Sequence, residues 1–233
     1  LQHTGYEEIG LLSLSSSDYT HIVELVKAVG QRFAGKHLAV SLPSLRIETF
    51  SIELMDALRD SRRGGFTLAP EAASERMRAI INKPVSTEQL LETARQVYSR
   101  GWTTLKLYFM IGHPSETIED VQAIADLCKA VLAEGRKVIG RRARLNPGVS
   151  TFIPKPHTPF QWVSCDTIEQ IQAKQALLKR ELRDRDIKLT WTNPQETMLE
   201  AWLSRGDRRM AQVIYRAWQK GAKLDAWQEH FNY

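Results

Sequence analysis

Cysteine is scarce in this sequence of 233 residues: the chain contains only Cys128 and Cys165, which lie far apart. This spacing excludes a disulfide framework and a zinc knuckle made by the chain alone. Cys128 falls on an apolar helical stripe, which predicts a small core residue, and Cys165 is assigned no function. Because structural disulfides are rare in reducing compartments, we expect the protein in the cytoplasm.

Long apolar runs are also missing, so we expect no membrane-spanning segment and no membrane partner. No signal-peptide pattern opens the chain. The phosphate-binding patterns of the Walker loop and of Gly-x-Gly-x-x-Gly are absent as well. The sequence begins at Leu1 without an initiator methionine, which leads us to expect a piece of a longer protein.

The formal charge of +5 comes with 42% hydrophobic and 25% charged residues, an ordinary globular balance. Acidic residues are interleaved in most of the basic clusters, and only "RKVIGRRAR" at 136–144 lacks a compensating acid. We therefore favour solvated helix faces and keep an RNA- or ribosome-binding surface as the alternative. The clusters lie at 59–63, 136–144, 179–185 and 205–209.

Strand-like and helical patterns alternate along the chain. Ser86 with Gln89, and Asp166 with Glu169, are predicted to cap helices. Predicted strands cover 9–14, 37–42, 65–69, 103–111 and 143–153, the last interrupted at Pro147-Gly148. Predicted helices cover residues 19–33, residues from about 52 to 59, and a stretch after Pro70. Three further helices are predicted from apolar stripes: Leu90, Ala94 and Val97 in the first, Ile118, Val121, Ala125, Cys128 and Leu132 in the second, and Ile168, Ile171, Leu178 and Leu182 in the third.

Five strand-then-helix units in series predict an α/β fold with parallel strands and right-handed crossovers. A barrel-like and a doubly wound sheet both fit this pattern. We expect residues 1–186 to form a partial (β/α) TIM-like barrel of about five β/α units, truncated at its N-terminus. Residues 187–233 are expected to add a short strand and a helical extension broken near Gly206, in which three tryptophans serve as buried anchors.

The loops that follow the predicted strands have unusual compositions: "SSSD", "PSLR", "APEA", "IGHPSE" and "FIPKPHTP". In barrels and in doubly wound sheets, ligands bind where the strands end and the loops begin. A series of loops rich in Pro, Ser, Glu and small residues on one edge therefore favours a ligand-binding rim over an inert scaffold.

The segment "TLAPEAASERMRAIINKP" carries Glu71 just past a strand and Lys83 twelve positions later. A carboxylate can accept hydrogen bonds from both hydroxyls of a ribose, and a lysine can pair with a ligand carboxylate. The segment resembles the fourth strand and following helix of the radical S-adenosylmethionine (SAM) superfamily. The resemblance implies that Glu71 and Lys83 contact the ribose and the carboxylate of SAM.

The segment "KLYFMIGHPSET" is similar to the superfamily's fifth strand, with Gly112, Pro114, Glu116 and Thr117 at the matching positions of its turn. The resemblance implies that backbone near Met110 contacts the adenine of SAM. The position of Tyr108 often carries a polar residue near the ribose. His113 is read as a turn residue at a helix entrance, with an acid–base role as the alternative.

The proline-rich segment "FIPKPHTPF" resembles the loop that closes over the adenine in the methylthiotransferase-like branch of the superfamily. Proline fixes φ, so this loop is organised before a ligand binds. The carbonyls of Phe152 and Ile153 are the predicted acceptors for the adenine amino group. The segment "SLSSSDY" lies where many members carry Gly-Gly-Glu for the SAM amino group, which makes Ser15, Ser16, Ser17 and Asp18 the candidates.

The resemblance extends over nearly the whole chain and includes the Elongator-type branch. It is nearest to an uncharacterised family in which a cobalamin-binding-type region precedes the barrel. It implies an enzyme that uses a 4Fe-4S cluster to cleave SAM reductively to a 5′-deoxyadenosyl radical, with cobalamin a further cofactor of the full-length protein. The substrate stays unknown. The cluster-binding Cys-x-x-x-Cys-x-x-Cys is absent, so we expect this chain by itself to be inactive.

Two other functions stay open from the residues. A non-catalytic module could bind RNA or a ribosomal partner through the basic rim. A plain aldolase-type or phosphate-binding barrel needs a lysine within a strand, and Lys106 is the only such residue.

Overall fold

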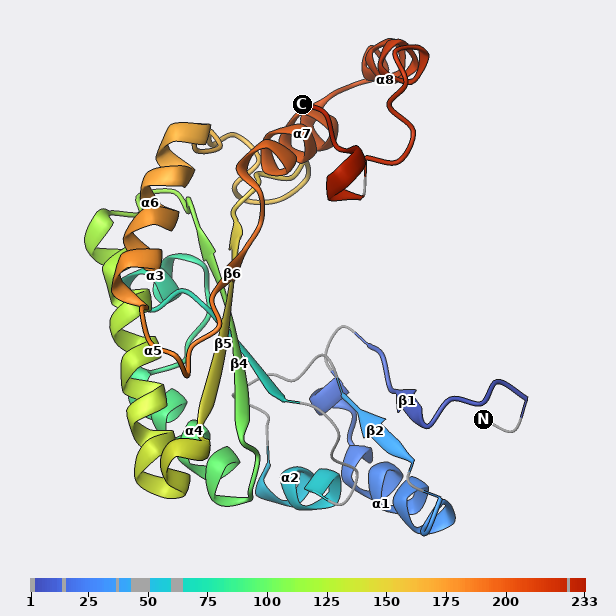
Figure 1. Cartoon of the computed structure of the whole chain (residues 1–233), viewed down its shortest axis with the longest axis vertical. Helices are drawn as coiled ribbons and strands as arrows, with labels where there is room; N and C mark the ends of the chain where they lie inside the picture. Colours follow the sequence, from blue (N-terminus) through green and yellow to red (C-terminus); the bar gives the residue numbers. More distant parts are fainter. Residues whose placement is uncertain (1–2, 14–15, 37, 43–50, 60–64, 226) are drawn as a thin grey trace.

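The computed structural model describes residues 3–13, 16–36, 38–42, 51–59, 65–225 and 227–233 (Figure 1). The first part of the chain forms β1 (Glu8–Gly10), the 3₁₀ turn η1 (Ser16–Asp18), α1 (Ile22–Arg32), β2 (Ala39–Ser41) and α2 (Ile52–Arg59). β1 and β2 pair in parallel as a two-stranded sheet. In Figure 1 this small sheet and α1 lie at one side of the molecule, apart from the larger sheet.

The larger sheet is parallel, with the strand order β3-β4-β5-β6. Its strands are β3 (Phe66–Glu71), β4 (Thr104–Ile111), β5 (Arg144–Thr151) and β6 (Thr190–Trp191). The connecting helices are α3 (Glu75–Ile80), α4 (Thr87–Ser99), α5 (Ile118–Ile139), followed by the turn η2 (Gly140–Arg142), and α6 (Ile168–Glu181). Parallel strands with helical crossovers confirm the predicted α/β class. In the described part of the chain the strands form two sheets, without hydrogen bonds that close a barrel.

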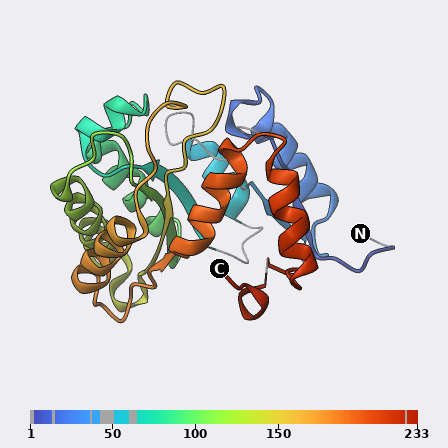
Figure 2. The ribbon, with the colours of Figure 1, turned by 90° about the horizontal axis from the view of Figure 1, so that it is seen from above.

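Helices α3 to α6 cover one face of the larger sheet, and the other face is open (Figures 1 and 2). The burial of β4 alternates strictly: Leu105, Leu107, Phe109 and Ile111 are buried under the helices. The residues between them point to the open face, because successive side chains of a strand point to opposite sides. This face is called the concave face below.

The strand β5 passes straight through Pro147-Gly148, where the sequence analysis placed an interruption, so that prediction was wrong. Proline cannot donate to a sheet ladder. The consequence appears instead in the β5–β6 pairing, which consists of an isolated bridge at Leu145–Ile187 and a ladder that starts at Gly148–Thr190. Pro147 lies in the gap between the two, and the full-length β4–β5 ladder keeps the strand in place.

The helix caps were predicted in part. Ser86 and Gln89 form the expected capping box of α4. The α6 prediction was wrong by one residue, because Thr167 with Gln170 makes the box. Asp166 accepts instead from Lys174 Nζ at 2.6 Å.

Ile118, expected on the apolar stripe of α5, is exposed, while the other four stripe residues are buried.

The C-terminal part comprises α7 (Pro194–Arg205), α8 (Met210–Gln219) and the turn η3 (Gln228–His230), and the predicted break near Gly206 is confirmed. The prediction of buried tryptophan anchors was wrong: Trp202, Trp218 and Trp227 are 50%, 52% and 60% exposed. No residue of α8 is buried. The proposed domain boundary between residues 186 and 187 stays a prediction, and β6 beyond it joins the larger sheet.

Across the described ranges, every helix is too short or too polar to serve as a bilayer span.

Candidate functional site

The carboxyl ends of β3, β4 and β5 meet at one edge of the larger sheet. Glu71 ends β3, Met110 lies next to the end of β4, and Phe152 follows β5 directly. The Phe152 backbone N–H donates to the carbonyl of Ile111 at 2.8 Å, which continues the pairing past the last residue of β5. Three neighbouring parallel strands therefore bring the predicted contacts for ribose and adenine to one edge.

Glu71 has an unusual backbone at this edge. The register between β3 and β4 shifts between Leu68 and Glu71, and Glu71 has a positive φ of 63°. A bulge of this kind redirects the side chain at a strand end. Three other described residues besides glycine have positive φ: Ser115 and His157 in the loops after β4 and β5, and Asn82 in the turn before Lys83. Strained backbone gathers at functional sites.

Lys83, which follows the positive-φ Asn82, lies 3.7 Å from the Glu71 carboxylate, Nζ to Oε1. Its backbone is held by two hydrogen bonds of 2.8 Å: its N–H donates to the Arg78 carbonyl, and its own carbonyl accepts from Val85. Burial raises the pKa of Glu71, and the positive charge of Lys83 partly offsets this effect. The two residues predicted from their spacing are thus neighbours in space, in a partly desolvated position.

The buried Arg78 holds the turn beneath this pair. Its guanidinium donates to the carbonyl of Ala73 at 2.8 Å and to the hydroxyl of Thr87 at 2.7 Å. Burial lowers the pKa of Arg78, against the opposing effect of Glu75. Nothing in the local sequence around Arg78 shows that this cation is only 1% exposed, so its role could not be found from the sequence.

Tyr108 and Met110 lie on the concave face, opposite Gly148 and Ser150 of β5. A Cβ atom on Gly148 would stand 2.9 Å from two carbons of the Tyr108 ring. One edge of the ring therefore packs against β5 at Gly148, where no side chain obstructs it. Tyr108 is 47% exposed on this face, so it is available to a ligand that lies across the strands.

The proline-rich loop after β5 is anchored by contacts between aromatic rings, one tilted and one edge-to-face. The Phe152 ring lies 5.1 Å from the ring of His113 and 5.7 Å from that of Phe160, centroid to centroid. The carbonyl of Phe152 accepts from the Cys165 thiol at 3.5 Å, and Ile153 is half-buried beside it. His113 is buried, and neither of its ring nitrogens has a hydrogen-bond partner among the described residues. Burial, reinforced by Lys174, lowers its pKa, so His113 is a neutral support for Phe152.

An ion network centred on Lys174 connects the loops after β4 and β5 on the helix-covered side of the sheet. Lys174 of α6 donates to Glu116 and to Asp166, each at 2.6 Å, and Glu116 accepts from the Gly112 backbone N–H at 2.8 Å. Burial by itself would lower the pKa of Lys174, but the two carboxylates outweigh it and leave the pKa raised. Burial raises the pKa of Glu116. Sequence reasoning found Glu116 by its motif but missed Lys174, which lies 58 positions away.

The described candidates for the SAM amino group, Ser16, Ser17 and Asp18, lie in the turn that follows β1 of the smaller sheet. Ser15 lies outside the described residues. Ser16 and Ser17 are buried in η1, after β1, and the Ser16 hydroxyl donates to the Leu11 carbonyl at 3.0 Å. Their role toward SAM stays a prediction.

The residues present do not fit an iron–sulfur cluster. Such a cluster needs three thiolates near one another. Cys128 is buried in the core, where burial raises its pKa, and Cys165 contacts the proline-rich loop. Among the described residues no group of three or more His, Cys, Asp or Glu side chains is placed to hold a metal ion.

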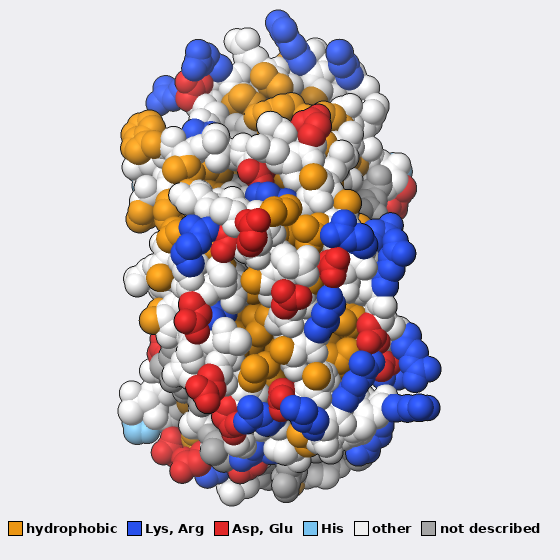
Figure 3. All heavy atoms as spheres, turned by 90° about the vertical axis from the view of Figure 1, so that its left-hand side faces the viewer, with side chains coloured by type: hydrophobic (Ala, Val, Ile, Leu, Met, Phe, Trp, Pro, Cys, Tyr) orange, Lys and Arg blue, Asp and Glu red, His pale blue; other side chains and the backbone are white. Residues whose placement is uncertain are grey.

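The basic cluster at 136–144 is compensated by acids that are distant in sequence. Arg136 donates to Asp184 at 2.9 Å and to Asp186 at 2.7 Å, and Arg144 pairs with Asp186 at 2.8 Å. In Figure 3, acidic and basic side chains alternate over the helix-covered side of the molecule. The absence of a nearby acid in the sequence was therefore misleading, because the fold supplies one.

The parallel sheet thus carries a carboxylate and a lysine side by side at one strand end. Comparison with known proteins identifies the class: residues 1–128 match the family model of the Radical SAM superfamily. The chain belongs to this superfamily. The match covers the elements from β1 into α5 and includes Glu71, Lys83, Tyr108 and Met110.

An uncharacterised protein of Methanocaldococcus jannaschii is 32% identical over 207 residues, covering 89% of this chain and 43% of the relative. The chain thus spans less than half the length of that relative. Among solved structures, a sugar phosphate isomerase/epimerase from Parabacteroides distasonis aligns with 94% of this chain and 87% of its own, at 11% identity and a TM-score of 0.37.

Proposed function

We propose that this chain supplies the SAM-binding wall of a radical SAM enzyme. The chemistry of such an enzyme is the reductive cleavage of SAM by a 4Fe-4S cluster, which yields a 5′-deoxyadenosyl radical. Membership of the superfamily supports the class of enzyme. The observation that carries the SAM-binding role is the Glu71–Lys83 pair, 3.7 Å apart at the strand end.

The roles of the residues follow from their chemistry. Glu71 would accept hydrogen bonds from the ribose hydroxyls, and Lys83 would pair with the methionine carboxylate. The exposed Tyr108 ring and the backbone at Met110 would border the ribose and the adenine. The carbonyls of Phe152 and Ile153 would accept from the adenine amino group. The proline-rich loop is already anchored by His113 and Phe160, so binding orders little additional chain.

The thiolates for the cluster are not supplied by this sequence, and we expect this polypeptide alone to bind SAM without cleaving it. We assign the enzyme to the methylthiotransferase- or Elongator-like branch, with a cobalamin-binding region in the full-length protein, on the motifs alone.

Isothermal titration of the purified chain with SAM tests this function. We expect 1:1 binding that is weakened about tenfold or more by Glu71→Gln and by Lys83→Met, because each change removes a charge-assisted hydrogen bond. The control is Glu181→Gln, which removes the 3.0 Å partner of Lys129 on α6 and should leave SAM affinity unchanged. Failure of the wild-type chain to bind SAM contradicts the proposal.

Reconstitution with iron and sulfide tests the expected inactivity. The chain should stay colourless, since its two cysteines cannot bind a cluster. A stoichiometric brown chromophore with thiolate-to-iron absorption would show that this expectation is wrong.

Binding of RNA or a ribosomal partner is the alternative function. Its support in the structure is limited to exposed basic residues such as Arg141 and Arg142, for which the described residues provide no acidic partner. If the alternative holds, RNA affinity falls steeply as salt is raised. Salt-independent or undetectable RNA binding would eliminate it.

A further inference from the structure

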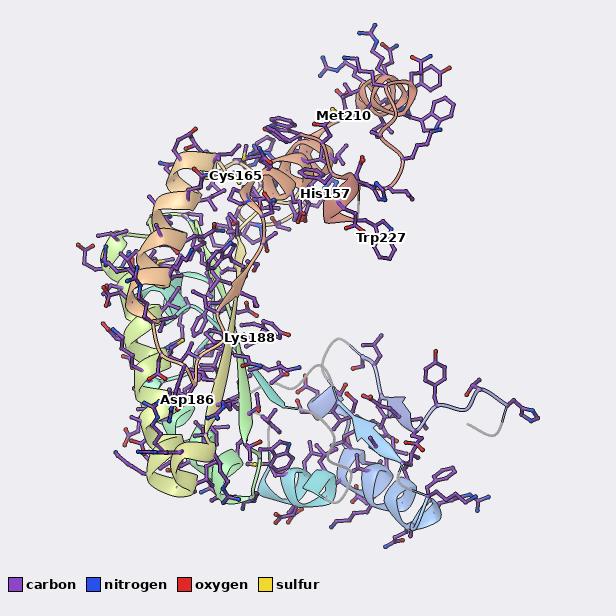
Figure 4. All side chains as sticks on the ribbon, in the orientation of Figure 1. His157, Cys165, Asp186, Lys188, Met210 and Trp227 are labelled. Atoms are coloured by element: carbon purple, nitrogen blue, oxygen red, sulfur yellow. The ribbon has the colours of Figure 1, made fainter. Side chains whose placement is uncertain are left out.

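A row of polar side chains crosses the concave face below the candidate SAM site. The sheet register places Thr67, Lys106 and Asn146 side by side on β3, β4 and β5. Lys188 continues the row: Thr190 pairs with Gly148, so the residue two positions earlier lies beside Asn146. Ile187 and Leu189 pack against the core, which turns Lys188 to the concave face, where Figure 4 labels it.

Lys106 differs from every other half-buried lysine in the described part of the chain. Lys83, Lys155 and Lys174 each pair with a carboxylate within 3.7 Å. Lys106 is half-buried without any ion pair or hydrogen bond to the described residues. A partly desolvated cation without a partner is unfavourable unless something else supplies the negative charge.

The stem of the Lys106 side chain passes close to a glycine. Its Cε atom lies 3.3 Å from the place where a Cβ atom on Gly65 would stand, so the side chain runs over a position without a side chain. Asn146, half-buried beside it, also lacks a hydrogen-bond partner among the described residues. The acidic side chain that ends β3 on this face, Glu71, is engaged by Lys83.

We propose that Lys106, Asn146 and Lys188 form a subsite for an anionic group, phosphoryl or carboxylate, of the enzyme's substrate. Neighbouring strands are about 4.8 Å apart, so the backbones of Lys106 and Lys188 stand about 10 Å apart with Asn146 between them. Two flexible four-carbon stems can converge on one anion over that distance, and the Asn146 amide can donate to it. The assignment of this anion to the substrate rests on the proposed function; the anion site does not.

The position of Lys106 relative to the candidate SAM site is suitable for holding a substrate. Tyr108 and Met110 lie two and four residues further along β4 on the same face, about 7 and 13 Å from Lys106. A substrate held by its anion at Lys106 would therefore extend toward the ribose end of SAM. This geometry suits a small molecule with an acidic group at one end and the reacting carbon at the other.

Titration with inorganic phosphate and, separately, with succinate tests the subsite by NMR at low ionic strength. We expect at least one of the two anions to bind. Lys106→Met should weaken that binding about tenfold, and Lys188→Met by a smaller factor because Lys188 is more exposed. The control Lys179→Met removes one exposed charge of α6 and should have no effect.

Lys106→Arg separates anion binding from a covalent role of this lysine. Arginine keeps the charge and its donors but is no amine nucleophile, so anion binding should persist in this variant. Trapping of a carbonyl compound on Lys106 by borohydride, lost in Lys106→Arg, would overturn the subsite in favour of a Schiff-base lysine. Equal affinity of Lys106→Met and the wild type for both anions would also overturn it.

SAM titrations of the same proteins keep the two proposals apart. SAM binding without anion binding removes the subsite and leaves the proposed function standing. Anion binding that depends on Lys106, in a chain that does not bind SAM, keeps the subsite and removes the proposed function. Retention of SAM binding in Lys106→Met shows in addition that the variant is folded.

Discussion

Glu71 combines a positive φ, a half-buried carboxylate and an ion pair with Lys83. A residue other than glycine in this region of φ costs about 1–3 kcal/mol, so the surrounding structure must hold it there. The bulge in β3 and the turn at Asn82 and Lys83 do so. A substitution that removes the strain at this position should raise the stability of the fold and lower the affinity for SAM.

The pH dependence of SAM binding follows from the raised pKa of Glu71. The carboxyl is ionised above its pKa and loses acceptor capacity when protonated. Because burial raises this pKa above the usual 4.5, affinity for SAM should begin to fall at a pH above 4.5 as the solution is acidified. SAM titrations at several pH values measure this step in affinity. In Glu71→Gln the step should be absent; its persistence there would assign it to another group.

Gly148 is predicted to control the Tyr108 ring. In Gly148→Ala the new methyl group would stand 2.9 Å from the ring carbons, so the ring must move and SAM affinity should fall several-fold. In a Tyr108→Ala background the same change should have no further effect, since no ring is left to displace. Additive losses in the double variant would show that Gly148 acts through something other than Tyr108.

At the scale of elements, α6 holds two strand-end loops in place through the ion pairs of Lys174. Its two carboxylate partners come from the loop after β4 and the loop after β5. Glu116 is 3% exposed, so removal of the cation leaves a buried charge unpaired. The loops that carry the predicted adenine contacts thus depend on one residue of a helix behind the sheet.

Lys174→Met should lower the free energy of unfolding by about 3 kcal/mol. Lys129→Met is the matched control: it also removes a lysine that joins two elements, Lys129 to Glu181 at 3.0 Å, but at an exposed position. The control should cost less than about 1 kcal/mol. Urea denaturation of both variants measures the difference, and equal losses would show that the Lys174 network carries no special stability.

At the scale of the whole molecule, one part is well packed and another is not. Helices α4 and α5 each bury several residues against the larger sheet. No residue of α8 is buried, and in Figure 1 this helix stands away from the sheet. The C-terminal region therefore depends on the rest of the fold less than its aromatic content suggested.

Hydrogen exchange of the intact chain should show this difference. Backbone amides of α8 should exchange at least ~100-fold faster than those of α5, because local opening of α8 exposes little new apolar surface. Mass spectrometry of peptides from 210–219 and 118–139 makes the comparison. Equal protection of the two helices would mean that α8 is covered in solution.

The sequence by itself determined the parallel α/β class and most helix positions, and it placed Glu71 and Lys83 at one ligand site as a hypothesis. These features depend on periodicity, caps and motifs within a few turns of chain. Tertiary structure decided what spans long separations: the Lys174 network, the acids that neutralise Arg136, the open space for the Tyr108 ring, and the unpartnered Lys106. Such contacts join residues from different strands and helices, and local patterns carry no information on which of them meet. The exposed tryptophans make the same point, since hydrophobic character alone does not say whether another element covers a side chain.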